Sequence, residues 1–343
     1  MKSVNKILIF RLSSIGDIIL TSALIRCIKN KYPRARVDFV IKKQFYQLVE
    51  SNPHINNIYI VDKGKGIDGL KQLAKSLKEE NYDVFLDIHK NFRSLYVRNF
   101  SGANKIFTFN KQVLKRTLLT SFGINIYKYI KPVYLRYIEA AKQIGVEYDG
   151  NGTEVFIPEY VRVTVSKKLQ NNGIYPDYPF VALCPGASFK NKQWIPERFA
   201  ELASLINDRN SLPIVVIGGD TEVEIGNLIV KNSSGKVVNL AGKLNLLESG
   251  AVLSRARVVV VNDTGMLMMA ESQHTPVVGI YGPTAKWFGF YPILPQSEVV
   301  EVDLKCRPCT KMGLNECPKK HWKCMLNIST EMVYEKVSRI LSI

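Results

Sequence analysis

Short apolar runs alternate with amphipathic stretches along the first 90 residues of the chain. Strand-like runs and stretches of helical periodicity follow one another in the order 7–10, 18–30, 37–41, 44–51, 58–61, 67–80 and 84–88. Repeats of this kind are typical of a parallel sheet with helices on both faces. The stretch 103–135 is basic and aromatic without a clean period, so we expect a loop and a helix near an acceptor there.

A second alternation begins after the stretch 149–160, whose Gly and Pro residues are typical of a linker. Strand-like runs and helical stretches follow in the order 180–183, 196–208, 214–217, 237–240, 246–255, 258–261 and 277–280. Ser329 or Thr330 as a cap and an apolar stripe predict a last helix over 329–343. We therefore expect two doubly wound α/β domains, 1–155 and 175–328, and that helix. Ligands bind at the carboxyl ends of such strands, so two facing domains would enclose a cleft.

Net charge distinguishes the two halves of the chain. Residues 1–150 hold 26 Lys and Arg against 12 Asp and Glu, a net charge of +14. Residues 151–343 hold 21 against 18, a net charge of +3. This asymmetry favours an anionic partner for the first domain, with a solvated basic surface as the alternative.

Targeting signals are not recognisable in the sequence. Residues 1–6 lead directly into a strand without the long apolar region of a signal peptide, and no apolar run approaches 18 residues. We therefore expect a cytoplasmic protein whose six cysteines are reduced.

The loop 11–17 joins the first strand to the first helix and carries Arg11, Ser13, Ser14 and Asp17. A phosphate-binding loop would place repeated Gly residues and a Lys here. A carboxylate is instead suited to accept a proton from a hydroxyl. Two interpretations of Asp17 are open, since an acid in the first turn of a helix also stabilises that helix by about 0.3–1 kcal/mol.

Three segments of the second domain follow predicted strands and are suited to a nucleotide. Asn262-Asp263-Thr264-Gly265 opens a helix whose N–H groups could receive a diphosphate. The segment 184–194 carries Ser188 and two lysines, of which Lys192 is a natural phosphate partner. The acid of the turn 218–222 could hold the hydroxyls of a ribose. Taken singly, each segment could equally be a helix cap or a surface loop.

The order and spacing of these segments resemble one family. The opening loop, Pro-Gly-Ala-Ser…Lys-x-Trp, Gly-Gly-Asp-x-Glu and Asn-Asp-Thr-Gly are followed by Tyr281-Gly282-Pro283-Thr284. Over nearly its whole length the sequence resembles the bacterial ADP-heptose:lipopolysaccharide heptosyltransferases, glycosyltransferase family 9. The resemblance implies the GT-B fold, with the acceptor in the first domain and the nucleotide-sugar in the second. It also implies an inverting, metal-independent transfer that uses no cofactor.

The resemblance also assigns roles to individual residues. Asp17 matches the proposed general base. The positions matching the donor site are Ser188, Lys192, Glu222, Leu244, Asp263, Thr264 and Gly265. Candidates for holding an anionic acceptor, for each of which a solvated surface role is an equal alternative, are Arg11, Ser14, His89, Lys90, Asn91 and Arg93. One position departs from the family: Met268 stands where a His is usual, which leaves the donor sugar open.

Four cysteines near the C-terminus are spaced as Cys306-x2-Cys309-x7-Cys317-x6-Cys324, with His321 nearby. They could form a structural zinc site, although the spacing is not that of a standard finger. Reduced, unliganded cysteines are the alternative, and no catalytic metal is expected. Cys27 and Cys184 are interpreted as core or turn residues.

These observations predict a glycosyltransferase that moves heptose from ADP-heptose to the lipopolysaccharide inner core at the cytoplasmic face of the inner membrane. The closest alternative is the same fold with another nucleotide-sugar or glycan acceptor. A nicotinamide-dependent oxidoreductase is disfavoured because no Gly-x-Gly-x-x-Gly follows a strand. A nucleic-acid partner would rest on charge alone and is not expected.

Overall fold

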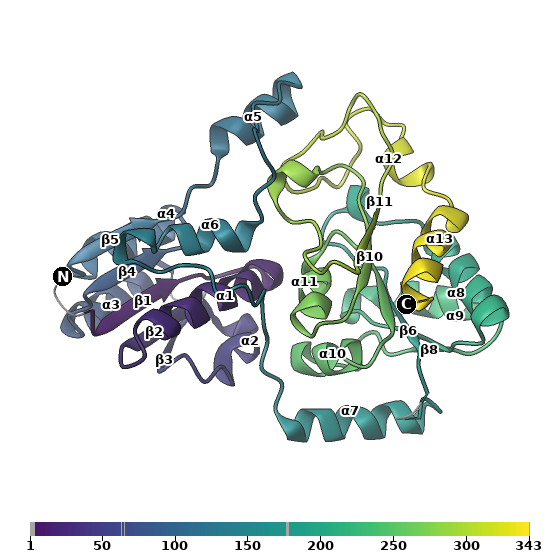
Figure 1. Ribbon diagram of the computed structural model, residues 1–343, viewed down its shortest axis with the longest axis horizontal. Coiled ribbons are helices and arrows are strands. Elements are labelled where there is room, and N and C mark those ends of the chain that lie inside the picture. The colour runs from purple at the N-terminus through teal and green to yellow at the C-terminus, as the bar shows by residue number, and fades with distance from the viewer. Residues whose placement is uncertain (1–3, 63, 65, 176–177, 343) are drawn as a thin grey trace. The chain divides into compact units, whose positions relative to one another are not determined.

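Two parallel β-sheets organise the chain, each within its own compact unit (Figure 1). The computed structural model describes residues 4–62, 64, 66–175 and 178–342. The first unit comprises Met1–Lys111 and Val133–Phe156, and the second comprises Gln112–Pro132 and Ile157–Ile343. The segment Gln112–Pro132 therefore packs with the second unit although it lies in the first half of the sequence.

The sheet of the first unit has the strand order β3-β2-β1-β4-β5. Its strands are β1 (Lys6–Phe10), β2 (Arg36–Lys42), β3 (Asn57–Val61), β4 (Val84–Asp87) and β5 (Lys105–Thr108). Its helices are α1 (Ile15–Lys31), α2 (Gln47–Glu50), α3 (Gly66–Glu79), α4 (Phe92–Phe100) and α6 (Val133–Glu139). Because the strand order reverses between β1 and β4, the loops after these two strands meet at a topological switch point, where doubly wound sheets bind ligands.

Alternating side chains of β1 divide the interior of this unit into two layers. Leu8 and Phe10 lie in one buried cluster with Leu77 of α3 and Val97 of α4. The intervening residues Ile7 and Ile9 are also fully buried, as expected for a strand in a parallel sheet covered on both faces. Helix α1 packs against α6, and α3 packs against α4.

The second unit has the sheet order β11-β10-β9-β6-β7-β8. Its strands are β6 (Val181–Cys184), β7 (Ile214–Val216), β8 (Val237–Asn239), β9 (Val258–Asn262), β10 (Val277–Ile280) and β11 (Glu298–Val300). Its helices are α5 (Val113–Phe122), α7 (Glu159–Asn171), α8 (Pro196–Asn210), α9 (Val223–Asn232), α10 (Leu246–Leu253), α11 (Gly265–Ser272), α12 (Lys323–Leu326) and α13 (Thr330–Leu341). The switch point of this sheet lies between β6 and β9.

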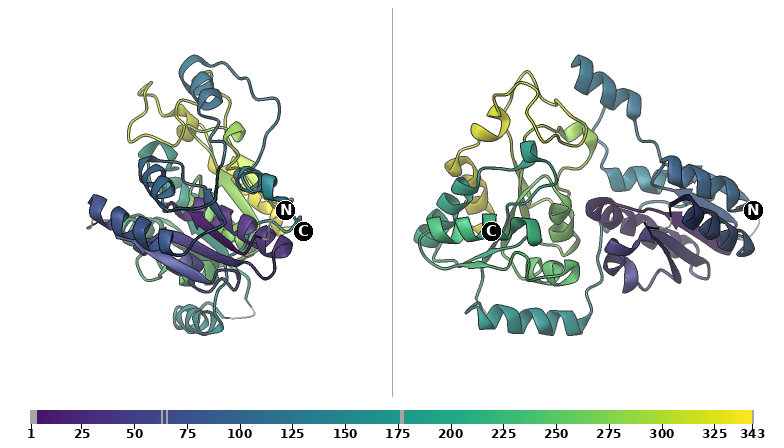
Figure 2. Two further views of the ribbon diagram at one scale, coloured as in Figure 1. Left: turned by 90° about the vertical axis from the view of Figure 1, so that its left-hand side faces the viewer. Right: turned by 180° about the vertical axis from the view of Figure 1, so that it is seen from behind.

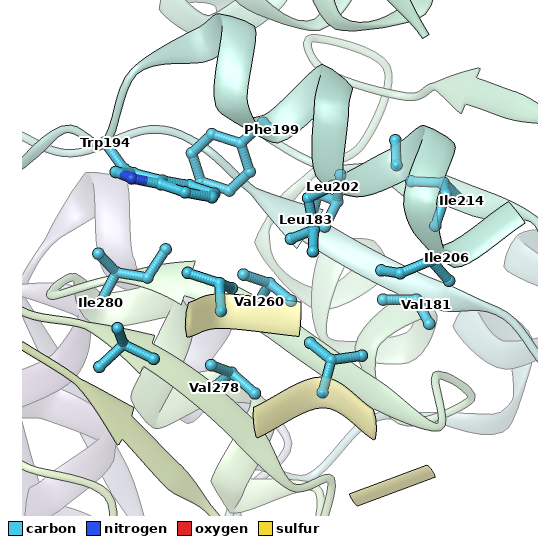
Figure 3. Close-up of a cluster of buried hydrophobic side chains, with 14 of the residues drawn as sticks. Val181, Leu183, Trp194, Phe199, Leu202, Ile206, Ile214, Val260, Val278 and Ile280 are labelled. Carbon is cyan, nitrogen blue, oxygen red and sulfur yellow. The ribbon is translucent and has the colours of Figure 1, made fainter. Parts of the chain in front are cut away.

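The core of the second unit fills the space between the sheet and helices α8 and α13. Figure 3 shows valine and isoleucine side chains of the strands facing Trp194, Phe199 and Leu202. Trp194 is fully buried, its ring meets that of Phe199 edge-on, and its indole N–H donates to the Ile328 carbonyl at 3.0 Å. The C-terminal helix α13 joins this core through Val333 and Val337, and Ser329 caps it as predicted.

The structure refines the predicted elements at several points. The helix expected over 44–51 is a 3-10 turn, Lys43–Phe45, followed by the short α2. Helices α4 and α7 and strand β5 were not predicted from the sequence pattern. Among the described residues, no helix is both long and apolar enough to cross a membrane.

Candidate functional site

The switch point of the first unit is built by the loop after β1 and the turn after β4. Arg11 bridges these two segments, because its Nη1 donates to the Ile88 carbonyl at 2.5 Å and its Nε donates to the Ser13 carbonyl at 2.8 Å. Arg11 is 6 % exposed. Its third contact is an ion pair of 2.5 Å between Nη2 and Oδ2 of Asp17. Arg11 thus fixes the loop and the position of the Asp17 carboxylate.

Asp17 lies in the first turn of α1, three residues after the N-cap Ser14. The backbone N–H of Ser14 donates to Asp17 Oδ2 at 3.3 Å, and the Ser14 hydroxyl lies 3.1 Å from the same oxygen. The Tyr137 hydroxyl donates to Oδ1 at 2.8 Å. Burial acts to raise the pKa of Asp17, but the Arg11 charge and the hydrogen bonds from Tyr137 and Ser14 outweigh it and lower the pKa. Asp17 is therefore an ionised carboxylate at neutral pH, and it also stabilises the helix.

Tyr137 of α6 belongs to this site, although no motif or periodicity indicated it. The centre of its ring lies 5.4 Å from the Arg11 guanidinium carbon. The ring also packs edge-on against Phe109, with 5.0 Å between the two ring centres. Burial and the neighbouring Asp17 charge raise the pKa of Tyr137, so it stays a protonated hydrogen-bond donor to Asp17. Tyr137 lies just beyond the stretch 103–135, in a short helix that no sequence pattern predicted.

Asp87, the last residue of β4, organises the turn that carries the acceptor candidates. Its fully buried carboxylate accepts hydrogen bonds from the backbone N–H groups of His89 and Lys90, at 3.1 and 2.6 Å, and from the Ser94 hydroxyl at 2.8 Å. Arg98 of α4 forms an ion pair with this carboxylate, with 3.2 Å between Arg98 Nη1 and Asp87 Oδ2. Asp87 therefore holds the residues that follow β4 at the edge of the sheet. It was not among the predicted site residues.

The acceptor candidates of the first unit differ in their placement. His89 is half-buried, and its Nδ1 is a buried atom without a hydrogen-bond partner among the described residues. Burial, reinforced by the Arg11 and Lys111 charges, lowers the pKa of His89 to about 3, so the ring is neutral. Lys90 Nζ donates to the Phe109 carbonyl at 3.4 Å. Arg93 is exposed on α4.

Asn262, the last residue of β9, connects β9 to the loop after β6 at the switch point of the second unit. The side chain of this buried residue donates to the Pro185 carbonyl at 2.7 Å and accepts from the backbone N–H of Trp194 at 3.2 Å. The buried Trp194 side chain thereby anchors the segment that contains Lys192. The Lys-x-Trp spacing consequently has a structural reason as well as a chemical one.

Lys192, Asp263 and Thr284 form a polar cluster beside Asn262. Lys192 Nζ lies 2.9 Å from Asp263 Oδ2, and the Thr284 hydroxyl donates to the same oxygen at 2.8 Å. Both charged side chains are largely buried, with 13 % and 12 % of their surface exposed. Thr284 is the last residue of the Tyr-Gly-Pro-Thr motif, and its contact with Asp263 explains the presence of a hydroxyl at that position.

The N-terminus of α11 lies next to this cluster. Thr264 caps the helix by accepting from the Met266 N–H at 3.3 Å, and Thr264 and Gly265 are half-buried. The first N–H groups of an α-helix have no partner within the helix, and the helix dipole favours an anion there. Together with Lys192, the N–H groups of this helix start provide hydrogen-bond donors for an anion at the carboxyl edge of the sheet.

Glu222 follows β7 and reaches the same edge. Its carboxylate accepts from the Gly219 N–H and the Thr221 hydroxyl, each at 2.8 Å. Its side chain packs on two glycines: a Cβ built at Gly186 would lie 2.6 Å from Glu222 Cγ, and one at Gly218 would lie 2.5 Å from Glu222 Cβ. The glycines of the two loops therefore admit the Glu222 side chain. Of the other donor candidates, Ser188 is exposed and Leu244 is half-buried.

Met268 lies on α11 one turn after the helix start and is 4 % exposed. At this position the side chain is part of the interior of the second unit. A buried thioether supplies neither the charge nor the strong hydrogen bond that a histidine would. That this residue changes the donor sugar stays a prediction.

The six cysteines are all reduced. Burial raises the pKa of Cys27 to about 11 and that of Cys184 to about 12, which agrees with inert core positions. Cys306 Sγ lies 3.7 Å from His321 Nε2. Within the described part of the chain, no group of three or more histidine, cysteine or acidic side chains is arranged to hold a metal ion. The structural zinc site at Cys306, Cys309, Cys317 and Cys324 therefore stays a prediction that this geometry does not support.

Comparison with known proteins identifies the family. Residues 70–322 match the family model described as glycosyltransferase family 9 (heptosyltransferase), which covers more than half of the chain. The chain belongs to this family. The predicted family and the prediction of a sugar-transferring enzyme are thus confirmed.

Relatives of this family 9 enzyme align along nearly its whole length. It is 24 % identical over 349 residues to lipopolysaccharide heptosyltransferase 2 of Escherichia coli, with 98 % of each chain covered. It is 27 % identical over 345 residues to lipooligosaccharide heptosyltransferase 2 of Campylobacter jejuni, again with 98 % of each covered.

Solved structures of family 9 enzymes share the fold. The family 9 glycosyltransferase of Veillonella parvula superposes with a TM-score of 0.81 at 24 % identity, covering 99 % of this chain and 98 % of its own. ADP-heptose lipopolysaccharide heptosyltransferase II of E. coli gives a TM-score of 0.76 at 21 % identity, with 98 % and 99 % covered. These similarities confirm the predicted GT-B class of two α/β domains.

Proposed function

We propose that this family 9 enzyme transfers heptose from ADP-heptose to the lipopolysaccharide inner core. The observation that carries the proposal is Asp17, a carboxylate held ionised by Arg11 and Tyr137 at the switch point of the first unit. Relatives named as lipopolysaccharide and lipooligosaccharide heptosyltransferases support the donor and acceptor class.

The donor is assigned to the second unit. Lys192 and the N–H groups at the start of α11 would hold the diphosphate, and Glu222 would hold the ribose hydroxyls. An incoming diphosphate can replace Asp263 as the partner of Lys192 and release the Asp263 carboxylate toward hydroxyls of the sugar. Ser188, Thr264 and Gly265 border the same edge of the sheet, and Leu244 is assigned to the adenine.

Transfer proceeds in one inverting step in this proposal. The acceptor hydroxyl oxygen attacks C1 of the heptose while the bond from C1 to the diphosphate oxygen breaks, and the electron pair leaves with ADP. Asp17 accepts the hydroxyl proton during the attack, a contribution of about 10²–10⁴ in rate. Lys192 and the helix N–H groups stabilise the developing charge on the diphosphate, the task that a metal ion performs in other transferases.

The acceptor is assigned to the basic first unit. Arg11 and Ser14 adjoin Asp17, and the neutral, half-buried His89 ring can form a hydrogen bond with an acceptor hydroxyl. Lys90 and Arg93 supply charge for phosphorylated core sugars. Because such acceptors are linked to lipid, the enzyme would work in peripheral contact with the cytoplasmic face of the inner membrane.

The proposal is tested by transfer to a defined, deacylated inner-core acceptor, with the product linkage determined by NMR. We expect transfer from ADP-heptose with inversion at C1 and with equal rates in the presence and absence of EDTA. Retention at C1, or loss of activity that is restored by added divalent metal, would contradict the mechanism.

The alternative is a family 9 enzyme of different donor specificity, which the buried Met268 favours. Calorimetric titration with ADP-heptose, UDP-sugars and GDP-sugars separates the two. Tighter binding of a UDP- or GDP-sugar would replace the proposed donor and leave the fold and the role of Asp17 intact.

A further inference from the structure

The segment Gln112–Pro132, here called the α5 segment, exposes an unusual number of large apolar side chains. Of the 22 large hydrophobic residues exposed in the described chain, seven lie in this segment: Val113, Leu114, Phe122, Ile124, Ile126, Tyr129 and Ile130. Leu114 and Phe122 are each 69 % exposed. Contiguous apolar surface of this kind is uncommon on soluble proteins and marks a site of interaction.

Three apolar side chains of α5 share one face of the helix. Leu114, Leu118 and Phe122 are spaced four residues apart, so they form a stripe along the helix. Arg116 lies on the opposite face, and Leu119, the buried residue of the helix, lies between the two faces. Leu119 and Arg116 contact Phe288 of the second unit. Within the stripe, Leu114 and Phe122 are exposed at its two ends and Leu118 between them is half-buried.

Several contacts fix the α5 segment to the second unit. Leu119 and Tyr127 form a buried cluster with Phe288, and the Tyr127 ring stacks on Trp287 at 5.9 Å. Lys311 Nζ lies 2.6 Å from the Thr117 hydroxyl. Both views in Figure 2 show α5 standing clear of the sheet of its unit. The helix that carries the stripe is therefore held in place by contacts with its own unit.

Charge identifies the partner. No Asp or Glu occurs in the α5 segment, which contains four Lys and Arg. Within the α5 segment, Lys128 is exposed among the apolar residues, and Lys115 lies 5.6 Å from the Tyr127 ring. A helix binds an anionic bilayer surface when its apolar side chains enter the boundary between headgroups and acyl chains and its cations contact the lipid headgroups.

We propose that the α5 segment docks the enzyme on an anionic phospholipid bilayer. The stripe of Leu114, Leu118 and Phe122 inserts at the boundary between headgroups and acyl chains, and the lysines contact lipid phosphates. This inference deepens the proposed function, since it supplies the surface by which an enzyme with a lipid-linked acceptor reaches it. The segment binds lipid by itself and requires neither donor nor acceptor.

The experiment is co-sedimentation of the full chain with vesicles, in the absence of nucleotide-sugar and acceptor. Vesicles of phosphatidylethanolamine and phosphatidylglycerol are compared with vesicles of phosphatidylcholine alone. We expect binding to the anionic vesicles that weakens as salt is raised. Leu114→Ser with Phe122→Ser should reduce this partitioning by about tenfold or more, because two large apolar groups no longer leave water.

The matched control is Tyr160→Ser with Val163→Ser, which removes two exposed apolar side chains from α7 of the same unit and should leave binding unchanged. A second readout is Phe122→Trp with brominated lipids, in which quenching of the new indole reports insertion directly. Circular dichroism confirms that each variant is folded.

The outcomes separate this inference from the proposed function. Equal vesicle binding by wild type and the α5 double variant, or no binding by wild type, would overturn the inference even if transfer to a soluble acceptor proceeds. A wild-type dimer that becomes monomeric in the double variant, without vesicle binding, would also overturn it and assign the stripe to a second copy. Intact vesicle binding without transfer activity would count against the proposed function alone.

Discussion

Protonation of His89 provides a quantitative test of the first unit's site. Burial, together with the Arg11, Lys111 and Lys42 charges and despite Asp17, lowers the pKa of this imidazole to about 3. In the unfolded chain the ring titrates near about 6.5. Between these two pH values the unfolded chain binds more protons than the folded one, so stability is lost as the pH falls.

The size of the effect follows from the two pKa values. At pH 7 neither state holds much charge on His89, and the penalty is small. At pH 5 the unfolded state is protonated and the folded state is not, which lowers the free energy of unfolding by about 2 kcal/mol relative to pH 7. His89→Gln removes the titrating ring, so this part of the pH dependence should vanish in the variant.

Hydrogen exchange of the β1 and β4 amides, corrected for intrinsic rates at each pH, measures the stability of the first unit separately from the second. His54→Gln is the control, because His54 is a half-buried histidine of the same unit that packs against Phe156 instead. The reasoning is refuted if wild type and His89→Gln lose the same protection between pH 7 and pH 5.

Three further predictions concern the second unit. Lys192→Ala should weaken ADP binding by about ten- to a hundredfold in calorimetric titration, as expected for a charge-assisted contact, whereas Lys190→Ala in the same turn should not. Trp194→Ala should lower the free energy of unfolding, measured by urea denaturation, by about 3–5 kcal/mol. A loss no larger than that of a typical surface substitution would contradict the anchoring role of Trp194. Gly186→Ala should weaken ADP binding by displacing Glu222, and unchanged affinity would show that Glu222 does not hold the nucleotide.

Strand positions were predicted well from the sequence, because parallel strands buried on both faces read as continuous apolar runs. The run Val258–Val261 is β9, and Ile7–Phe10 falls within β1. Helices without a clear apolar stripe were harder to find. Helix α4 has only two buried residues, Ser94 and Val97, so its amphipathic signal is weak.

The ion pairs Arg11–Asp17 and Lys192–Asp263 consist of predicted site residues. Asp87, and the Tyr137 and Thr284 hydroxyl groups that bind these pairs, were not assigned to the site. Asp17 and Lys192 stand next to strand ends, where chain order alone places them at the edge of a sheet. Tyr137 reaches Asp17 from 120 residues away, and Thr284 reaches Asp263 across 21 residues. Such contacts depend on how α6 and the loop after β10 pack, which local sequence patterns do not specify.

Asp17→Asn tests the central claim most directly. The amide keeps the size of the side chain and loses the ability to accept the hydroxyl proton. We predict that turnover from ADP-heptose to a deacylated core acceptor falls by about 10²–10⁴ at saturating donor, while calorimetric affinity for ADP stays the same. Asp68→Asn, on the exposed surface of α3, should retain wild-type turnover. Full turnover by Asp17→Asn with normal ADP binding would contradict the assignment of Asp17 as the base.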